Sequence, residues 1–156
     1  MKACVTGATG FVGAHIVRAL LEDGHGVRIT YRDPARLERL GGLEVEAVEA
    51  DVLDRAAMRR AAKGADVLFH CAGYVGARPR RRVWDVNALA PRVAVEAAAS
   101  AGVGRVVVTS TVATVGPSRE GRPADERSPY RRGHLGLTYA DAKREGEAEA
   151  FAAGAR

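Results

Sequence analysis

The stretch Thr6-Gly7-Ala8-Thr9-Gly10-Phe11-Val12-Gly13 decides the fold of this chain. It follows a short apolar run at 2–6 and opens a segment at 11–22 with the spacing of a helix. The first two glycines permit a tight turn and a close approach of the backbone to a diphosphate, and the third lets the helix pack against the strand. Free N–H groups at such a helix N-terminus bind phosphate oxygens. The stretch therefore predicts a dinucleotide site at the start of an α/β domain.

Apolar runs and helical segments alternate along the rest of the chain. The runs at 27–31, 45–48, 67–71 and 105–110 are typical of buried strands, and the segments at 34–40, 54–63, 83–101 and 139–153 are typical of helices. Strict alternation of strand and helix implies a parallel sheet with right-handed crossovers. We expect one α/β domain over residues 1–156, in which a doubly wound sheet of about five strands is the middle of three layers.

The basic charge of the chain is local. Lys and Arg number 24 and Asp and Glu number 19, and four of the arginines lie within 78–82, so the net charge of +5 falls to +1 without that run. A nucleic-acid partner would need a basic stripe or a recognised module, and we expect none. The arginine run is interpreted as a solvated loop, with a grip on a phosphorylated substrate as the alternative.

The two cysteines and the hydropathy of the chain indicate its compartment. Cys4 and Cys71 have neither metal nor redox spacing, and we expect them to be small buried hydrophobes in a reducing cytoplasm. No apolar run reaches the roughly 18 residues of a membrane span. We therefore expect a cytoplasmic protein with no metal site and no membrane partner.

The ends of the second and third predicted strands bear on the choice of cofactor. An acidic residue at the end of the second strand would bind the ribose of NAD, whereas Arg32 suits the 2′-phosphate of NADP. Asp33 comes one residue later and precedes Pro34, where it can cap a helix. The predicted cofactor is NADP, with NAD as the alternative. Asp51, after the third strand, is either an adenine contact or a turn residue.

Tyr139 and Lys143 stand four residues apart, on one face of the last predicted helix. A free phenol has a pKa of about 10 and is a poor acid–base group at neutral pH. A neighbouring ammonium favours the phenolate, so we expect Lys143 to lower the pKa of Tyr139 and prepare it for proton exchange. The same lysine is placed to hold a ribose.

Hydroxyl side chains follow the apolar part of the fifth predicted strand, within 109–114. This edge of an open α/β sheet is where ligands bind. A hydroxyl there can orient a substrate oxygen near Tyr139. For Thr109 and Thr114, hydrogen bonding within a turn is an equally good interpretation.

In this order the motifs resemble those of the extended short-chain dehydrogenases/reductases, in particular the dihydroflavonol-reductase-like and hopanoid-associated sugar-epimerase-like branch. Further matches are Leu68-Phe69-His70-Cys71-Ala72-Gly73, Trp84-Asp85-Val86-Asn87 and Pro123-Ala124-Asp125-Glu126, so the likeness covers essentially the whole chain. It implies a Rossmann-type domain and a catalytic set of Thr111, Tyr139 and Lys143, with Ser110 as the alternative to Thr111 and Asn87 as a structural residue. It also implies a cofactor site formed by Gly7, Thr9, Gly10, Phe11, Val12, Gly13, Arg32, Asp51, Val52, Cys71, Ala72, Gly73, Tyr139 and Lys143.

Departures from the family pattern favour its reductases. Val112 and Ala113 stand where the dehydratases carry acids, and Val115 stands where many sugar-nucleotide epimerases carry tyrosine. The resemblance thus implies hydride transfer between NADPH and a carbonyl or alcohol carbon, with Tyr139 exchanging the proton and Thr111 orienting the oxygen. The alternatives are an NAD-dependent sugar-nucleotide epimerase and a non-catalytic dinucleotide-binding protein. The expected partner is a small carbonyl, alcohol or sugar-nucleotide substrate, and a homodimer is one option for the full-length form.

Members of the family usually continue well beyond the tyrosine–lysine pair, whereas 13 residues follow Lys143 here. We expect the domain to be incomplete at its C-terminus and the substrate region to be missing. The strand at 105–110 would then be a sheet edge, prone to pair with other chains. The long irregular stretch at 116–137, which includes His134 as a candidate substrate contact, is expected to be functional.

Overall fold

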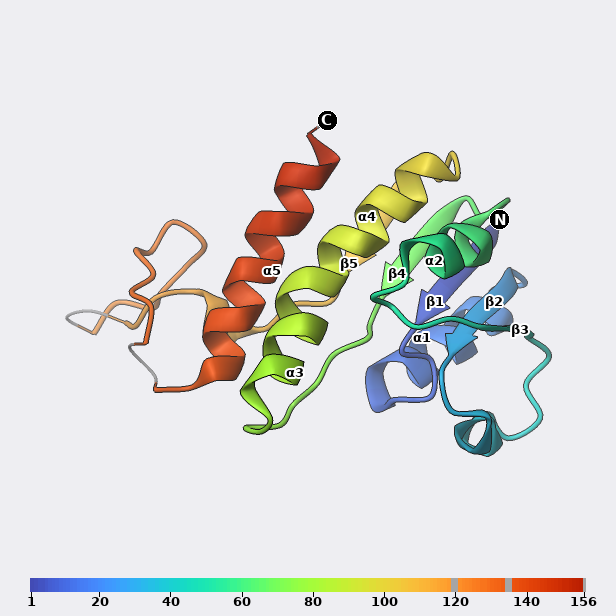
Figure 1. The fold of residues 1–156 in the computed structure, drawn as a ribbon, viewed down its shortest axis with the longest axis horizontal. Helices are drawn as coiled ribbons and strands as arrows, with labels where there is room; N and C mark the ends of the chain where they lie inside the picture. The colour runs from blue at the N-terminus through green and yellow to red at the C-terminus, as the bar shows by residue number, and fades with distance from the viewer. Residues whose placement is uncertain (119–120, 134–135, 156) are drawn as a thin grey trace.

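The computed structural model describes residues 1–118, 121–133 and 136–155, so His134 lies outside the described residues. Within these ranges, five parallel strands form one sheet in the order β3-β2-β1-β4-β5 (Figure 1). They are β1 (Lys2–Thr6), β2 (Gly26–Tyr31), β3 (Glu46–Glu49), β4 (Val67–His70) and β5 (Arg105–Val108). The strand order reverses beside β1, which creates a crevice at the carboxyl ends of β1 and β4. The predicted α/β fold with a Rossmann-type sheet is confirmed.

Helices cover both faces of the sheet, as predicted. Helix α1 (Phe11–Glu22) packs on one face, and α2 (Arg55–Ala62) and α4 (Ala90–Ser100) pack on the other. Helix α5 (Thr138–Gly154) lies alongside α4 (Figure 1). Strand β5 is the last strand of the sheet, which agrees with the expectation that it forms an edge.

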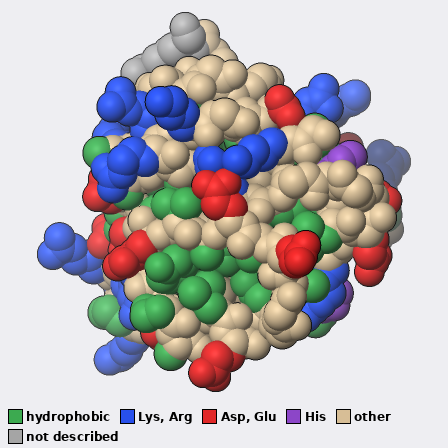
Figure 2. Space-filling model, turned by 90° about the vertical axis from the view of Figure 1, so that its right-hand side faces the viewer, with side chains coloured by type: hydrophobic (Ala, Val, Ile, Leu, Met, Phe, Trp, Pro, Cys, Tyr) green, Lys and Arg blue, Asp and Glu red, His purple; other side chains and the backbone are tan. Residues whose placement is uncertain are grey.

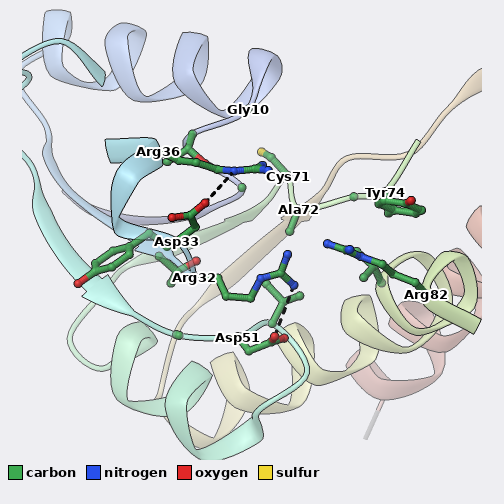
Figure 3. A pocket seen from close by; sticks show the side chains of 17 residues that line it. Gly10, Arg32, Asp33, Arg36, Asp51, Cys71, Ala72, Tyr74 and Arg82 are labelled. Atoms are coloured by element: carbon green, nitrogen blue, oxygen red, sulfur yellow. Dashed lines mark ion pairs between the residues drawn. The ribbon is translucent and has the colours of Figure 1, made fainter. Parts of the chain in front are cut away.

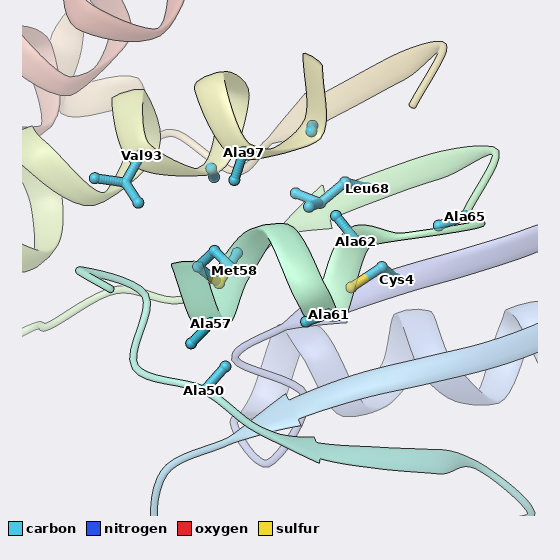
Figure 4. Packing of buried hydrophobic residues seen from close by; sticks show 12 residues of the cluster. Cys4, Ala50, Ala57, Met58, Ala61, Ala62, Ala65, Leu68, Val93 and Ala97 are labelled. Atoms are coloured by element: carbon cyan, nitrogen blue, oxygen red, sulfur yellow. The ribbon is translucent and has the colours of Figure 1, made fainter. Parts of the chain in front are cut away.

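Residues on β1 alternate between two hydrophobic clusters. Val5 faces α1 and joins Val17 and Ile29, whereas Cys4 faces α2 and joins Met58 and Leu68 (Figure 4). Alanines fill much of the second cluster, which lets α2 and α4 approach the sheet closely. Burial raises the pKa of the Cys4 thiol to about 11, and this cysteine is the inert buried group that the sequence predicted.

The helix predicted over 83–101 is present, but it begins earlier and is not a regular α-helix throughout. The chain forms a short helix α3 (Arg80–Trp84), a π-helical segment η2 (Asp85–Leu89) and then α4. Pro91 has no N–H to donate to the carbonyl of Asn87 four residues earlier, so regular α-helical bonding is interrupted there. Such π segments are frequent at functional sites.

Two 3-10 elements complete the described part of the fold. The segment predicted to be a helix at 34–40 is a 3-10 helix, η1 (Pro34–Leu40), and Asp33 caps it by accepting a hydrogen bond from the Ala35 N–H at 3.1 Å. A second 3-10 turn, η3 (Val112–Thr114), follows β5.

No helix in the described ranges is long and apolar enough to cross a membrane. Acidic and basic side chains both occur on the face shown in Figure 2, around a patch of hydrophobic side chains.

Candidate functional site

The glycine-rich turn has the geometry that its sequence predicted. Gly7 has a φ of +66°, and its carbonyl accepts a hydrogen bond from the Gly10 N–H at 2.9 Å. A Cβ on Gly7 would stand 2.6 Å from the Ala72 nitrogen, and a Cβ on Gly13 would overlap the Gly7 carbonyl. No side chain caps the start of α1. The turn, the end of β4 and the helix N-terminus are therefore in direct contact, and the helix presents N–H groups at the crevice.

A cavity of about 360 Å³ opens over this turn, within the size range of small-molecule sites (Figure 3). It brings together most of the predicted cofactor residues, namely Gly7, Thr9, Gly10, Arg32, Asp51, Val52, Cys71, Ala72 and Gly73. Three predicted contacts from the start of α1 are not in the lining. The Phe11 side chain is 82% exposed and stacks on His15, Val12 is exposed, and Gly13 is buried under the turn.

Charged side chains from two strand ends line one wall of the cavity. Arg32 and Asp51 form an ion pair at 3.6 Å, and Arg36 pairs with Asp33 at 3.4 Å (Figure 3). One oxygen of Asp51 accepts the Leu53 N–H at 2.9 Å, as a turn residue would, while the other faces Arg32. The structure thus bears out Asp51 as a turn residue, and its contact with an adenine stays a prediction.

Cys71 combines the two places predicted for it. Its side chain is half-buried, packs against the hydrophobic cluster on the α1 face and lines the cavity. Burial raises the pKa of the thiol, opposed by a hydrogen bond with Thr109 and by the charge of Lys143. The preceding residue, His70, is fully buried at the end of β4, with Nδ1 3.0 Å from the Thr6 hydroxyl.

Lys143 connects α5 to the cofactor cavity. Its buried ammonium donates to the Thr109 carbonyl at 2.7 Å and lies 4.0 Å from the position of a Cβ on Gly73, which lines the cavity. The ammonium therefore reaches the segment after β4 that lines the cavity. Burial lowers the pKa of Lys143, and the charge of Glu147 opposes this effect.

The expected effect of Lys143 on Tyr139 is not found. Burial of Tyr139, which packs near Val83 and Ala142, raises the pKa of its phenol instead of lowering it. Desolvation therefore prevails over any stabilisation of the phenolate by the lysine, whose ammonium bonds to Thr109. A phenol in this environment is protonated at neutral pH, which is the form that donates a proton.

The hydroxyl groups after β5 have different partners. Ser110 donates to Oε1 of Glu147 on α5 at 2.6 Å. The Thr114 hydroxyl has a single proton and lies 2.7 Å from the Thr111 carbonyl and 3.0 Å from the same Oε1. Thr111 lies between them and accepts the Ala113 N–H at 3.3 Å, and among the described residues its own hydroxyl proton has no acceptor. Because Ser110 is bonded to α5, the arrangement favours Thr111 over Ser110 as the substrate-facing hydroxyl.

Sequence reasoning missed three side chains of this site. Tyr74 and Arg82 line the cavity, with the guanidinium of Arg82 4.7 Å from the centre of the Tyr74 ring. Glu147 anchors the turn that carries Thr111. A signal existed for Glu147, which falls four residues after Lys143 on the same helix face, whereas the pairing of Tyr74 with Arg82 has no sequence pattern that predicts it.

A family model and curated relatives match most of this chain. The model of the NAD dependent epimerase/dehydratase family matches residues 3–156. Sterol demethylase protein B of Methylococcus capsulatus is 42% identical over 123 residues, which are 78% of this chain and 38% of that protein. A putative dihydroflavonol 4-reductase of Synechocystis is 38% identical over 124 residues, covering 78% of this chain and 36% of that protein.

Among solved structures, MoeE5 in complex with UDP-glucose and NAD superposes with a TM-score of 0.81 and 29% identity, covering 100% of this chain and 50% of that one. The chain belongs to the NAD dependent epimerase/dehydratase family, so the expected membership of the extended short-chain dehydrogenases/reductases is confirmed. It spans less than half the length of the curated relatives that it matches.

Proposed function

We propose that this chain is the cofactor-binding domain of an NADPH-dependent oxidoreductase that reduces a small carbonyl compound or oxidises the corresponding alcohol. The observation that carries the proposal is the contact of Lys143 with the Gly73 segment, because it places the predicted acid–base helix beside the cofactor cavity. We propose Thr111, Tyr139 and Lys143 as the catalytic set. The residue range 1–156 is proposed as one domain, with a cytoplasmic location.

The residues of the cavity fit a dinucleotide. A Cβ on Gly7 would collide with the Ala72 backbone, so only glycine lets the turn lie this tightly against the end of β4, and the start of α1 offers N–H groups to a diphosphate. Val52 and Asp51 would border the adenine, and Arg32 with Arg36 would face a ribose 2′-phosphate. When bound, the nicotinamide group would supply or accept the hydride.

The chain's own residues would handle the proton and the substrate oxygen. The protonated phenol of Tyr139 would donate to the carbonyl oxygen during reduction, and Thr111 would orient that oxygen with its free hydroxyl proton. Lys143 would hold the ribose from its position beside Gly73. Burial of Lys143 keeps this ammonium away from bulk water.

The preference for NADP rests on Arg32 at the end of β2, supported by Arg36. A second candidate function is an NAD-dependent sugar-nucleotide epimerase, favoured by the complex of MoeE5 with UDP-glucose and NAD. The Arg32–Asp51 pair at 3.6 Å also leaves a carboxylate within reach of a ribose. Under that alternative, the cofactor would be reduced and reoxidised in each turnover.

The two candidates differ in cofactor consumption. Purified protein should bind NADPH more tightly than NADH and should oxidise NADPH when supplied with a panel of ketones and aldehydes. Tyr139→Phe should abolish turnover and affect the Kd for NADPH far less, because the proton of the phenol acts on the substrate. Co-purified NAD with no net consumption would instead favour the epimerase, and dinucleotide binding with no turnover on either substrate class would favour a non-catalytic role for this chain.

A further inference from the structure

Arg82 enters the cofactor cavity from the side opposite to the strand-end arginines. It belongs to α3, and Figure 3 shows its guanidinium directed past Ala72 toward Arg32. Of the four arginines within 78–82, only Arg82 is part of the lining. Two guanidinium groups thus face one another across the cavity, from elements about fifty residues apart in sequence.

The structure holds Arg82 in this place through Tyr74. The buried Asn87 side chain accepts the Tyr74 N–H at 3.0 Å and donates to the Tyr74 carbonyl at 2.9 Å. The Tyr74 hydroxyl donates to the Arg78 carbonyl at 2.7 Å, so the ring is fixed at both ends. The guanidinium stacks on this ring, 4.7 Å from its centre. Stacking uses a face of the guanidinium and leaves the N–H groups at its edge free to bind an anion.

The charges around the cavity leave Arg82 unneutralised. Asp33 and Asp51 are within ion-pair distance of Arg36 and Arg32. Arg81, one residue before Arg82, pairs with Asp85 at 3.6 Å. Among the described residues, no carboxylate lies within 4.0 Å of the Arg82 guanidinium. A cation that faces other cations in a concave site is stabilised when an anion enters between them.

We propose that Arg82 is a phosphate ligand of the cofactor cavity and closes it from the α3 side. The assignment rests on the proposed function, and it adds a contact that the glycine turn and the strand-end arginines do not supply. Arginine suits this role because its planar fork of N–H groups binds two phosphate oxygens at once. The anion is a phosphate group of the dinucleotide, either its diphosphate or its 2′-phosphate.

Calorimetric titration of the protein with NADPH and with NADH tests the assignment. Arg82→Gln should raise the Kd for NADPH by about ten-fold or more, the usual effect of losing a hydrogen bond to a charged group. The matched control is Arg81→Gln, which removes the same charge from the neighbouring, 91% exposed side chain and should change this Kd by about two-fold or less. Contact with the 2′-phosphate would weaken NADPH alone, whereas contact with the diphosphate would weaken both dinucleotides equally.

Variants of Tyr74 test how Arg82 is held. Tyr74→Leu removes the ring and should raise the Kd for NADPH, while Tyr74→Phe keeps the stacking surface and should raise it less. Thermal unfolding of each variant establishes that it is folded. Equal Kd values for Arg82→Gln and Arg81→Gln would overturn the assignment of Arg82 and leave the proposed function intact. Failure of the wild-type protein to bind either dinucleotide would overturn the proposed function itself.

Discussion

The carbonyl oxygen of Asn87 packs directly against the backbone of Gly146, so that a side chain at position 146 would have no room. This contact joins the π segment to α5. The same asparagine fixes Tyr74 through its side chain, and α5 carries Tyr139 and Lys143. This one backbone contact therefore links the wall of the cavity to the helix that carries the proposed acid–base residues.

Gly146→Ala should destabilise the protein by about 1–3 kcal/mol, because the added methyl group overlaps a backbone atom that has no free direction in which to move. The intrinsic preference of alanine for helices acts in the opposite direction. Gly154→Ala in the same helix is the control, since its Cβ would lie 3.9 Å from a Val95 methyl group in ordinary contact. Urea unfolding should show a loss for the first variant and little change for the second; equal stability of the two would refute the close contact.

Much of this architecture could be predicted from the sequence, and the omissions have physical causes. Glycine spacing and strand periodicity are local signals, so the turn at 6–13 and all five strands were predicted. The π segment was not predicted, because it depends on both Pro91 and Gly146, which are fifty-five positions apart in the sequence. The direction of the Tyr139 pKa was wrong because it depends on burial, and helix-face spacing does not report burial. Arg82 was interpreted as part of a solvated loop, with a grip on a phosphorylated substrate as the alternative, because its stacking on Tyr74 is a tertiary contact.

Glu147 should act through the turn that carries Thr111. Glu147→Ala removes the acceptor of the Ser110 hydroxyl and one of the two acceptors of the Thr114 hydroxyl, and should lower the free energy of unfolding by about 1–3 kcal/mol. Glu147→Gln keeps an oxygen acceptor of similar size and should lower it less. Turnover should follow the same order, because Thr111 depends on this turn for its position. A glutamine variant as impaired as the alanine variant in both measurements would show that the charge matters rather than the hydrogen bonds.

The buried histidine should make stability depend on pH. Burial and the charge of Lys143 lower the pKa of His70 to about 3, whereas in the unfolded chain it would be near the ordinary 6.5. The unfolded state therefore binds the proton more readily, and the stabilisation is complete above about pH 6.5 and is lost as the pH falls toward 3. Binding of one proton on unfolding lowers the free energy of unfolding by about 1.4 kcal/mol for each pH unit, which is about 2 kcal/mol between pH 6.5 and 5.

Denaturant unfolding at pH 7 and pH 5 measures this dependence. His70→Asn has no titrating ring, so it should be less stable than the wild type at pH 7 and lose less stability on acidification. Glu46, whose pKa is lowered by hydrogen bonds from Arg28 and Lys2, contributes at more acidic pH, below its ordinary 4.5. The range from pH 7 to 5 thus separates the histidine from this carboxylate. Parallel loss of stability in the variant and the wild type would assign the effect to other groups.

Gly13→Ala should weaken dinucleotide binding more than it weakens the fold. The added methyl group would overlap the Gly7 carbonyl, which holds the Gly10 N–H, and would push the turn into the space proposed for the diphosphate. We expect a loss of NADPH affinity of about ten-fold or more, equivalent to about 1.4 kcal/mol. Gly104→Ala is the control, because its Cβ would approach the Asp66 carbonyl no closer than 3.8 Å and no ligand-lining residue is near it. Calorimetric titration should show wild-type affinity in the control, and wild-type affinity in Gly13→Ala as well would mean that the diphosphate does not bind at this turn.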